Sequence, residues 1–221
     1  RVRPFKRTPR PPQRTSRYTL YPVLSAVHQH MAAGCVCTPK ASVLLPLCRK
    51  KYHGMMREEL VFGPIHSRRL GSSLGINLLP TKGKLCNFDC VYCECGWNKD
   101  GRGDRKLPTA GELHETLEAK LKECSGAGTP IDSITFSGDG EPTLNPDFAE
   151  IIDITIALRD KYFPQAKVSV LSNATRIFRE DVFEALRKVD NPILKIDAPT
   201  DELAGRINQP QGEYHVEDVV A

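Results

Sequence analysis

The larger, C-terminal part of the chain alternates between two hydrophobic patterns. Short runs of apolar residues predict buried strands, and longer segments with apolar residues three or four positions apart predict amphipathic helices. Leu113, Leu117 and Leu121 repeat at i, i+4 and i+8, which indicates a helix over residues 109–124. The same patterns predict strands at 72–80, 131–136, 168–171 and 192–196, and helices at 145–163, 180–189 and from 216 onward.

This alternation indicates the fold class. Strands that alternate with helices form a parallel sheet with right-handed crossovers, so we expect an α/β fold. The loops at the carboxyl ends of such strands usually build the functional site. Asn145 followed by Pro146 is typical of a helix N-cap and first helical position, and it predicts where the second helix begins.

Charge divides the chain in two. Residues 1–56 contain eleven Lys and Arg, no Asp or Glu, and seven prolines; residues 57–221 contain the other 20 basic and all 27 acidic residues, a net charge of −7. We therefore expect a boundary near Met56, which we interpret as the functional start, and a preceding segment that is disordered or not native. A transit peptide and a basic nucleic-acid arm are the alternatives for residues 1–56.

Composition also limits the setting of the protein. No apolar run approaches the roughly 20 residues that a membrane-spanning helix needs, which argues against an integral membrane protein and a membrane partner. No signal peptide is evident, so we expect a cytoplasmic protein whose thiols stay reduced.

Three cysteines directly after the first predicted strand carry the candidate chemistry. Cys86, Cys90 and Cys93 have the spacing C-x3-C-x2-C. Three thiolates on one short loop can hold three corners of an iron–sulfur cube and leave the fourth iron open. Two alternatives remain: a structural zinc site, for which Cys95 would be a cramped fourth ligand, and disulfides, which a reducing compartment disfavours.

The cysteine spacing, with the aromatic Tyr92 before the last cysteine, resembles the signature of radical S-adenosylmethionine (radical SAM) enzymes. A second segment follows the second predicted strand and resembles the Gly-Gly-Glu motif of that family, with one acidic residue inserted: Gly138, Asp139, Gly140 and Glu141. The resemblance implies that this segment receives the amino group of the methionine moiety. A tight turn before a helix is the alternative interpretation of its glycines.

Three further residues resemble cofactor contacts of the same family. Asn173 and Asp197 follow the third and fourth predicted strands, where the family contacts the nucleoside, and Asn208 is similar to a residue that often reaches the ribose. A turn residue at Asn173 and an N-cap at Asp197 are the alternatives.

The resemblance covers residues 60–216 and implies a fold and an activity. The fold is a partial (β/α) TIM-like barrel truncated after about four strands, so that residues 57–221 form the N-terminal two-thirds of a radical SAM core. The activity is reductive cleavage of S-adenosylmethionine by a [4Fe–4S] cluster, which yields a 5′-deoxyadenosyl radical and needs an electron donor such as flavodoxin or ferredoxin. Truncation puts the activity of this chain alone in doubt. A non-enzymatic iron–sulfur electron-transfer or cluster-binding module is the alternative.

The substrate is the least determined feature. The run Phe62–Gly71 resembles the wyosine-synthetase-like and cofactor-maturase-like branch of the family, which suggests RNA. The acidic balance of residues 57–221 opposes this, because phosphate contacts dominate RNA affinity. We expect a small molecule or peptide rather than tRNA, with a few basic residues near the strand openings available for one anionic group: Arg68, Arg69, Lys82, Lys84 and residues 102–106.

Overall fold

The computed structural model describes residues 59–81, 83–100 and 106–220 of the chain. The segment that we expect to be disordered or non-native, residues 1–56, lies outside the described residues, as do Lys82 and residues 102–105 of the basic stretch.

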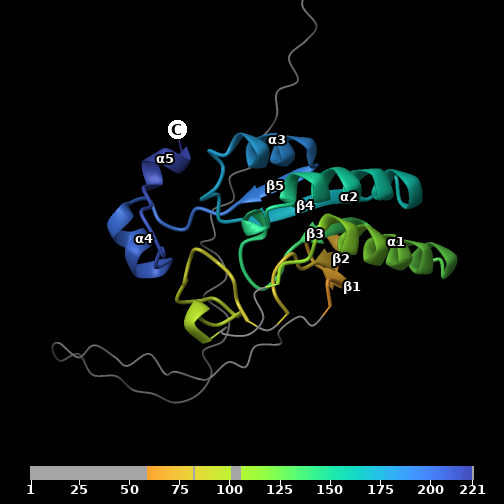
Figure 1. Ribbon diagram of the computed structural model, residues 1–221, viewed down its shortest axis with the longest axis horizontal. Helices are drawn as coiled ribbons and strands as arrows, with labels where there is room; N and C mark the ends of the chain where they lie inside the picture. The colour runs from red at the N-terminus through yellow and green to blue at the C-terminus, as the bar shows by residue number, and fades with distance from the viewer. Residues whose placement is uncertain (1–58, 82, 101–105, 221) are drawn as a thin grey trace, which may run out of the picture.

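One sheet of five strands, in the order β1-β2-β3-β4-β5, organises the described residues (Figure 1). Four strands are parallel, and each overlaps a strand that the apolar runs predict: β2 (Gly71–Ile76), β3 (Ser133–Phe136), β4 (Lys167–Ser172) and β5 (Asn191–Leu194). The first strand, β1 (Val61–Ser67), pairs antiparallel with β2 at the edge of the sheet. The predicted α/β class is therefore confirmed.

The apolar pattern does not predict β1, because Pro64 interrupts it. Proline donates no hydrogen bond to a strand ladder and is confined to edges and bulges. Both conditions hold here: β1 pairs with one neighbour only, and the register of its pairing with β2 shifts between Phe62 and Ile65, on either side of Pro64.

Three helices lie side by side over one face of the sheet: α1 (Ala110–Gly126), α2 (Phe148–Tyr162) and α3 (Glu180–Lys188) (Figure 1). Two shorter helices, α4 (Asp201–Ile207) and α5 (Val216–Val220), lie beyond the carboxyl end of β5. Two 3-10 turns, η1 (Asn98–Asp100) and η2 (Pro142–Leu144), belong to loops. No helix in the described ranges has the length and apolar character needed to span a bilayer.

The hydrophobic core fills the space between these three helices and the sheet. Leu113, Leu117 and Leu121 are fully buried, as the helical spacing predicts. They belong to one cluster with Ile134 of β3 and Val168 of β4. The core holds the three helices against one face of the sheet. The carboxyl ends of the parallel strands are followed by loops.

Helix α1 begins where the sequence places it. Thr109 is its N-cap: the Thr109 hydroxyl accepts a hydrogen bond from the Glu112 amide, and the Glu112 carboxylate accepts one from the Thr109 amide at 2.9 Å. This reciprocal pair satisfies two backbone groups that the first helical turn would otherwise leave unpaired.

The predicted start of α2 at Asn145 is wrong, because Asn145 is the C-cap of η2 and the helix begins at Phe148, after Asp147. The Asn145 side chain has another use. Its amide donates to the carbonyl oxygens of Leu78 at 3.1 Å and Pro108 at 2.9 Å. Asn145 thus ties the loop after β3 to both ends of the long segment between β2 and α1.

Candidate functional site

The three cysteines lie in the segment that follows β2, at the carboxyl end of the parallel strands (Figure 1). The start of this segment is bound to the loop after β3. The Leu85 amide donates to the Asp139 carbonyl at 3.0 Å, and the Leu85 carbonyl accepts from the Glu141 amide at 3.1 Å. This pairing brings the first cysteine next to the glycine-containing motif, as the strand-end rule predicts.

The middle of the cysteine segment is bound to the end of α4 and to the residue that follows it. The Asp89 amide donates to the Asn208 carbonyl at 2.9 Å, and the Val91 amide donates to the Ile207 carbonyl at 2.9 Å. Phe88 also forms an isolated bridge with Pro210. The segment therefore joins two parts of the chain that are more than a hundred residues apart.

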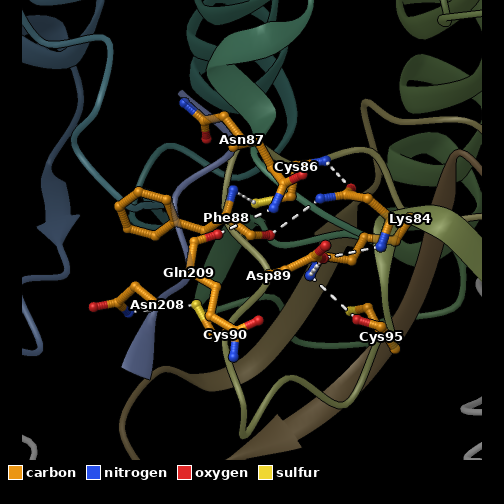
Figure 2. A network of polar contacts seen from close by, with 12 residues as sticks. Lys84, Cys86, Asn87, Phe88, Asp89, Cys90, Cys95, Asn208 and Gln209 are labelled. Atoms are coloured by element: carbon orange, nitrogen blue, oxygen red, sulfur yellow. Dashed lines mark hydrogen bonds and ion pairs between the residues drawn. The ribbon is translucent and has the colours of Figure 1, made fainter. Parts of the chain in front are cut away.

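The sulfur atoms of two cysteines accept hydrogen bonds from residues beyond β4 and β5. The Asn173 side-chain amide lies 3.7 Å from the Cys86 sulfur. The Asn208 side-chain amide lies 3.4 Å from the Cys90 sulfur, a contact drawn in Figure 2. Lys195 adds its ammonium group at 3.8 Å from the same Cys90 sulfur. Such donors stabilise negative charge on sulfur.

The thiols differ in acidity. A hydrogen bond from Cys95, assisted by Lys84, lowers the pKa of Cys93 to about 5. Burial raises the pKa of Cys86 to about 11, against the amide of Phe88 and the charge of Lys84. The thiolate is the form that binds metal, and metal binding itself displaces the thiol proton. Cys93 is thus better prepared than Cys86 to ionise before a metal arrives.

The donor set suits a soft metal centre, although the side chains are not gathered around one point. Cys86, Cys90 and Cys93 are free thiols on one loop, and thiolates favour iron–sulfur clusters and zinc. Within the described ranges, no three His, Cys, Asp or Glu side chains are grouped as ligands of a single ion. Holding a metal therefore requires the cysteine side chains to turn toward one another.

The glycine motif is packed against its own chain. A β-carbon at Gly138 would lie 2.0 Å from the Asn77 side-chain oxygen, which also accepts the Asp139 amide at 3.1 Å. A β-carbon at Gly140 would lie 1.8 Å from the Leu85 carbonyl oxygen. Both positions therefore require glycine for the close approach of neighbouring loops. Contact of these glycines with a ligand stays a prediction.

Glu141 is a buried carboxylate between β3 and β4. It accepts hydrogen bonds from the Ser172 hydroxyl at 2.8 Å, the Asn173 amide at 2.8 Å and the Thr143 hydroxyl at 2.7 Å. Burial raises the pKa of the Glu141 carboxyl, and these donors oppose the rise. Glu141 thus connects the glycine motif to Asn173 and, through it, to Cys86.

A polar cluster surrounds Cys90. Asp197 accepts hydrogen bonds from Tyr92, from Asn208 and, at 2.8 Å, from Lys195. Burial alone would raise the pKa of Asp197, but these three donors hold it below its ordinary value. Burial and the neighbouring Asp197 raise the pKa of the Tyr92 phenol, which therefore stays protonated.

Lys195 is the member of this cluster that sequence reasoning misses. Its ammonium group lies 4.7 Å from the centre of the Tyr92 ring, within cation–π distance. A lysine two residues before an aspartate that follows a strand is an available signal, because alternate residues of an extended segment point to the same side. The other residues predicted from the family resemblance fall into two neighbouring groups: Gly138, Asp139, Gly140, Glu141 and Asn173 near Cys86, and Tyr92, Asp197 and Asn208 near Cys90.

Two of the basic residues expected near the strand openings are elsewhere. Arg68 and Arg69 lie in the turn between β1 and β2, at the amino end of the parallel strands, because β2 begins at Gly71. Lys84 lies at the correct end, but its side chain is only 1% exposed and pairs with Asp89. None of these three residues presents a free cation to a ligand at the carboxyl edge.

Residues 81–221 match the family profile described as the Radical SAM superfamily, and this match covers more than half of the chain. The chain belongs to the radical SAM superfamily. The family resemblance of the cysteine motif is thereby confirmed. The α/β fold of a partial radical SAM barrel is confirmed with it.

Two relatives of the radical SAM chain are curated proteins that carry the name UPF0026. The UPF0026 protein MJ1312 of Methanocaldococcus jannaschii is 31% identical over 162 residues, which cover 73% of this chain and 47% of that protein. A UPF0026 protein of Helicobacter pylori strain J99 is 34% identical over 158 residues, which cover 71% of this chain and 49% of that protein. The chain spans about half the length of these relatives.

A solved structure of TYW1 with a lysine-pyruvate adduct bound is similar at 17% sequence identity and a TM-score of 0.44. The similarity covers 69% of this chain and 51% of that structure.

Proposed function

We propose that this chain is the cluster-bearing part of a radical SAM enzyme. Cys86, Cys90 and Cys93 bind a [4Fe–4S] cluster, and S-adenosylmethionine binds the iron that no cysteine ligates. The observation that carries the proposal is the position of the three thiols on one loop at the carboxyl edge of the parallel sheet, with side-chain donors of residues beyond β4 and β5 directed at two of the sulfurs. When bound, the two groups supply reductive cleavage of the sulfonium to a 5′-deoxyadenosyl radical.

The residues around the thiols orient the cysteine ligands and stabilise the negative charge on their sulfur atoms. Asn173, Asn208 and Lys195 direct N–H groups at the Cys86 and Cys90 sulfurs. Hydrogen bonds to cluster sulfur are among the factors that set the potential of an iron–sulfur centre, and they hold the ligands in one orientation. The protein in this way supplies binding and electrostatics, while the cofactors supply the difficult chemistry.

The two polar groups beside the cysteines are assigned to the two ends of S-adenosylmethionine. The edge formed by Gly138, Asp139, Gly140 and Glu141, with Asn173, receives the methionine end, and the cluster of Tyr92, Asp197 and Asn208 receives the nucleoside. The support is their position, on either side of the loop that carries Cys86 and Cys90. Tyr92 and Asp197 offer a hydroxyl and a carboxylate, groups that hydrogen-bond ribose hydroxyls and the adenine amino group.

Anaerobic reconstitution tests the cluster assignment. Wild type should bind about four irons per chain, the number in a [4Fe–4S] cluster. Ala at Cys86, Cys90 or Cys93 should abolish binding, whereas Cys124→Ala is the matched control, because Cys124 is buried in α1 within the core. Full iron loading of the Cys90→Ala protein would contradict the assignment.

The alternative, an electron-transfer module, is separated by the response to the second cofactor. A protein that ligates all four irons has no open position, so added S-adenosylmethionine would leave the electron paramagnetic resonance spectrum of the reduced cluster unchanged. A shifted spectrum supports the enzyme. A spectrum that does not change in the wild-type protein favours the module.

The substrate we propose is a small molecule or a peptide. The electron comes from a protein donor such as flavodoxin or ferredoxin. The compartment is the cytoplasm. The support against tRNA is the net charge of −7 over residues 57–221, together with the placement of Arg68 and Arg69 at the amino end of the sheet. The test is binding of bulk tRNA to the protein over a salt series. Tight binding that weakens steeply with salt would overturn this preference.

A further inference from the structure

An ion pair is buried directly under the cysteine loop. The Lys84 side chain is 1% exposed and that of Asp89 is 11% exposed, with 3.0 Å between the Lys84 Nζ and an Asp89 carboxylate oxygen (Figure 2). The Lys84 Nζ also donates to the Gly96 carbonyl at 3.2 Å. A buried pair is often no more stable than an apolar substitute, so its presence calls for a role besides stability.

The Asp89 end of the pair joins distant parts of the cysteine loop through hydrogen bonds. The carboxylate oxygen that accepts from Lys84 also accepts the Asn98 amide at 2.9 Å. The Asn98 side chain in turn accepts the Cys86 amide at 2.9 Å and donates to the Phe88 carbonyl at 3.3 Å. The residues before the first cysteine are thereby joined to those after the last one through protein groups alone.

The Lys84 end of the pair lies within the cysteine loop. Lys84 is two residues before Cys86, and its Nζ donates to the carbonyl of Gly96, whose amide donates to the Cys93 carbonyl at 3.3 Å. The Asp89 carboxylate is directed instead at Lys84 and the Asn98 amide. A fixed positive charge near an iron–sulfur cluster stabilises the reduced form, which is the more negative one, and so raises the reduction potential.

We propose that Lys84 is a positioning residue that sets the reduction potential of the cluster bound by Cys86, Cys90 and Cys93. Asp89 and the Gly96 carbonyl hold its ammonium group under the loop, and Asn98 holds the loop in shape around it. The inference rests on the proposed function, because it requires that the three cysteines hold the cluster. Lys84 touches no reacting atom; it acts through the charge that it places beside the thiolates.

Redox titration of the reconstituted protein, followed by electron paramagnetic resonance, tests the role. Lys84→Met should shift the midpoint potential to a more negative value, because it removes the cation and leaves Asp89 unpaired. Asp89→Asn should shift it to a more positive value, because the cation loses its counter-charge. Asn98→Ala is the matched control: it weakens the loop contacts without changing charge, and it should lower iron content more than it moves the potential. Equal potentials in the two charge variants would overturn the proposal.

Removal of one buried partner can prevent folding, so a neutral pair completes the experiment. Lys84→Gln with Asp89→Asn keeps the hydrogen-bonding groups without the charges. This protein should load iron and should have a potential different from that of wild type, because the two charges lie at different points of the loop and their fields do not cancel at the cysteines. An unchanged potential, or failure of this variant to load iron, would overturn the proposal, since the pair would then act only through folding. Absence of iron in wild type would instead contradict the proposed function.

Discussion

Gly140 and Leu85 interlock the two loops that build the site: a β-carbon on Gly140 would lie 1.8 Å from the Leu85 carbonyl oxygen. The two residues also form an isolated parallel bridge one residue before Cys86. Gly140 has a φ of +149°, a conformation that residues with a side chain rarely adopt. The path of the chain into the first cysteine therefore depends on the absence of a side chain after β3.

The first prediction concerns this contact. Gly140→Ala should displace residues 84–86 or unfold the loop, because the nearest atom to the added methyl group is backbone and cannot move away as a side chain can. Iron loading should fall strongly and the midpoint of urea unfolding should decrease. The control is Gly111→Ala in α1, where a β-carbon meets nothing within 4 Å. That change should stabilise by up to about 1 kcal/mol. Wild-type iron content in Gly140→Ala would contradict the prediction.

The second prediction concerns the buried carboxylate of Glu141. Glu141→Gln keeps the side-chain volume but replaces one acceptor oxygen by an NH2 group, which is a donor. One of the three donors that bind Glu141, on Ser172, Asn173 or Thr143, then faces another donor. We expect a loss of about 2–3 kcal/mol in the free energy of unfolding, measured by urea titration. Glu150→Gln on the exposed side of α2 is the control and should have little effect. Equal stability of the two variants would show that the buried contacts contribute nothing.

The third prediction concerns the start of α1. Thr109→Ala removes the hydroxyl that accepts the Glu112 amide, and we expect a loss of about 1 kcal/mol in unfolding free energy. Thr116→Ala is the matched control, because Thr116 is exposed in the helix interior and its hydroxyl only duplicates a bond to the Glu112 carbonyl. Alanine is also the better helix former there, so the control should be neutral or stabilising. A larger loss in the control than in Thr109→Ala would refute the cap.

The elements that the sequence predicts well are those with a strong local period. The leucines of α1 and the apolar runs of β2 to β5 indicate which faces of these elements are buried. The observed bounds of these elements lie within a few residues of the predicted ones. Strand β1 is not predicted, because a proline such as Pro64 is normally excluded from a strand and is tolerated here only at the edge of the sheet. Whether a strand lies at an edge depends on the arrangement of the whole sheet and cannot be read from the local sequence. Asn145 fails as an N-cap because the helix begins three residues later: the Asn145 side-chain oxygen accepts the Asp147 amide at 2.9 Å, before the helix, and its amide group donates to distant carbonyls.

The residues of the candidate site also divide into those that the sequence predicts and those that it does not. Cysteine spacing is local, and the strand-end rule brings Asn173 to the Cys86 sulfur without any knowledge of tertiary contacts. Asn208, which follows α4 and contacts the Cys90 sulfur, is expected only from the family resemblance. Lys84 cannot be assigned by such rules, because a lysine beside a loop looks like a surface residue until its counter-charge is known. The role of Lys195 depends likewise on Cys90 and Tyr92, which belong to the loop after β2; only its third partner, Asp197, is close to it in the sequence.

Asp190 is the point at which the end of α3 is fastened to the start of β4. One carboxylate oxygen accepts the Val168 amide at 2.9 Å and the Arg159 guanidinium at 2.8 Å, and the other accepts Lys167 at 3.2 Å. Partial burial alone would raise the pKa of Asp190, but these three donors hold it below its ordinary value. Because the carboxyl is more acidic in the folded protein than in the unfolded chain, the unfolded chain binds more protons as the pH falls.

The last prediction follows from this difference. The contribution of Asp190 to stability is present above its unfolded pKa of about 3.9 and is lost as the pH falls through the lower pKa of the folded state. Asp190→Asn should therefore reduce the free energy of unfolding by about 1–2 kcal/mol at pH 7, near the lower end for hydrogen bonds to a charged group because solvent screens this partly exposed carboxylate, and the difference from wild type should shrink below about pH 4. Urea titrations at a series of pH values measure it. Asp153→Asn is the control: Asp153 pairs with Lys188 at 2.7 Å on the exposed surface, where such pairs contribute little. A deficit in Asp190→Asn that stays constant down to pH 3 would show that the ionised carboxylate is not the stabilising form.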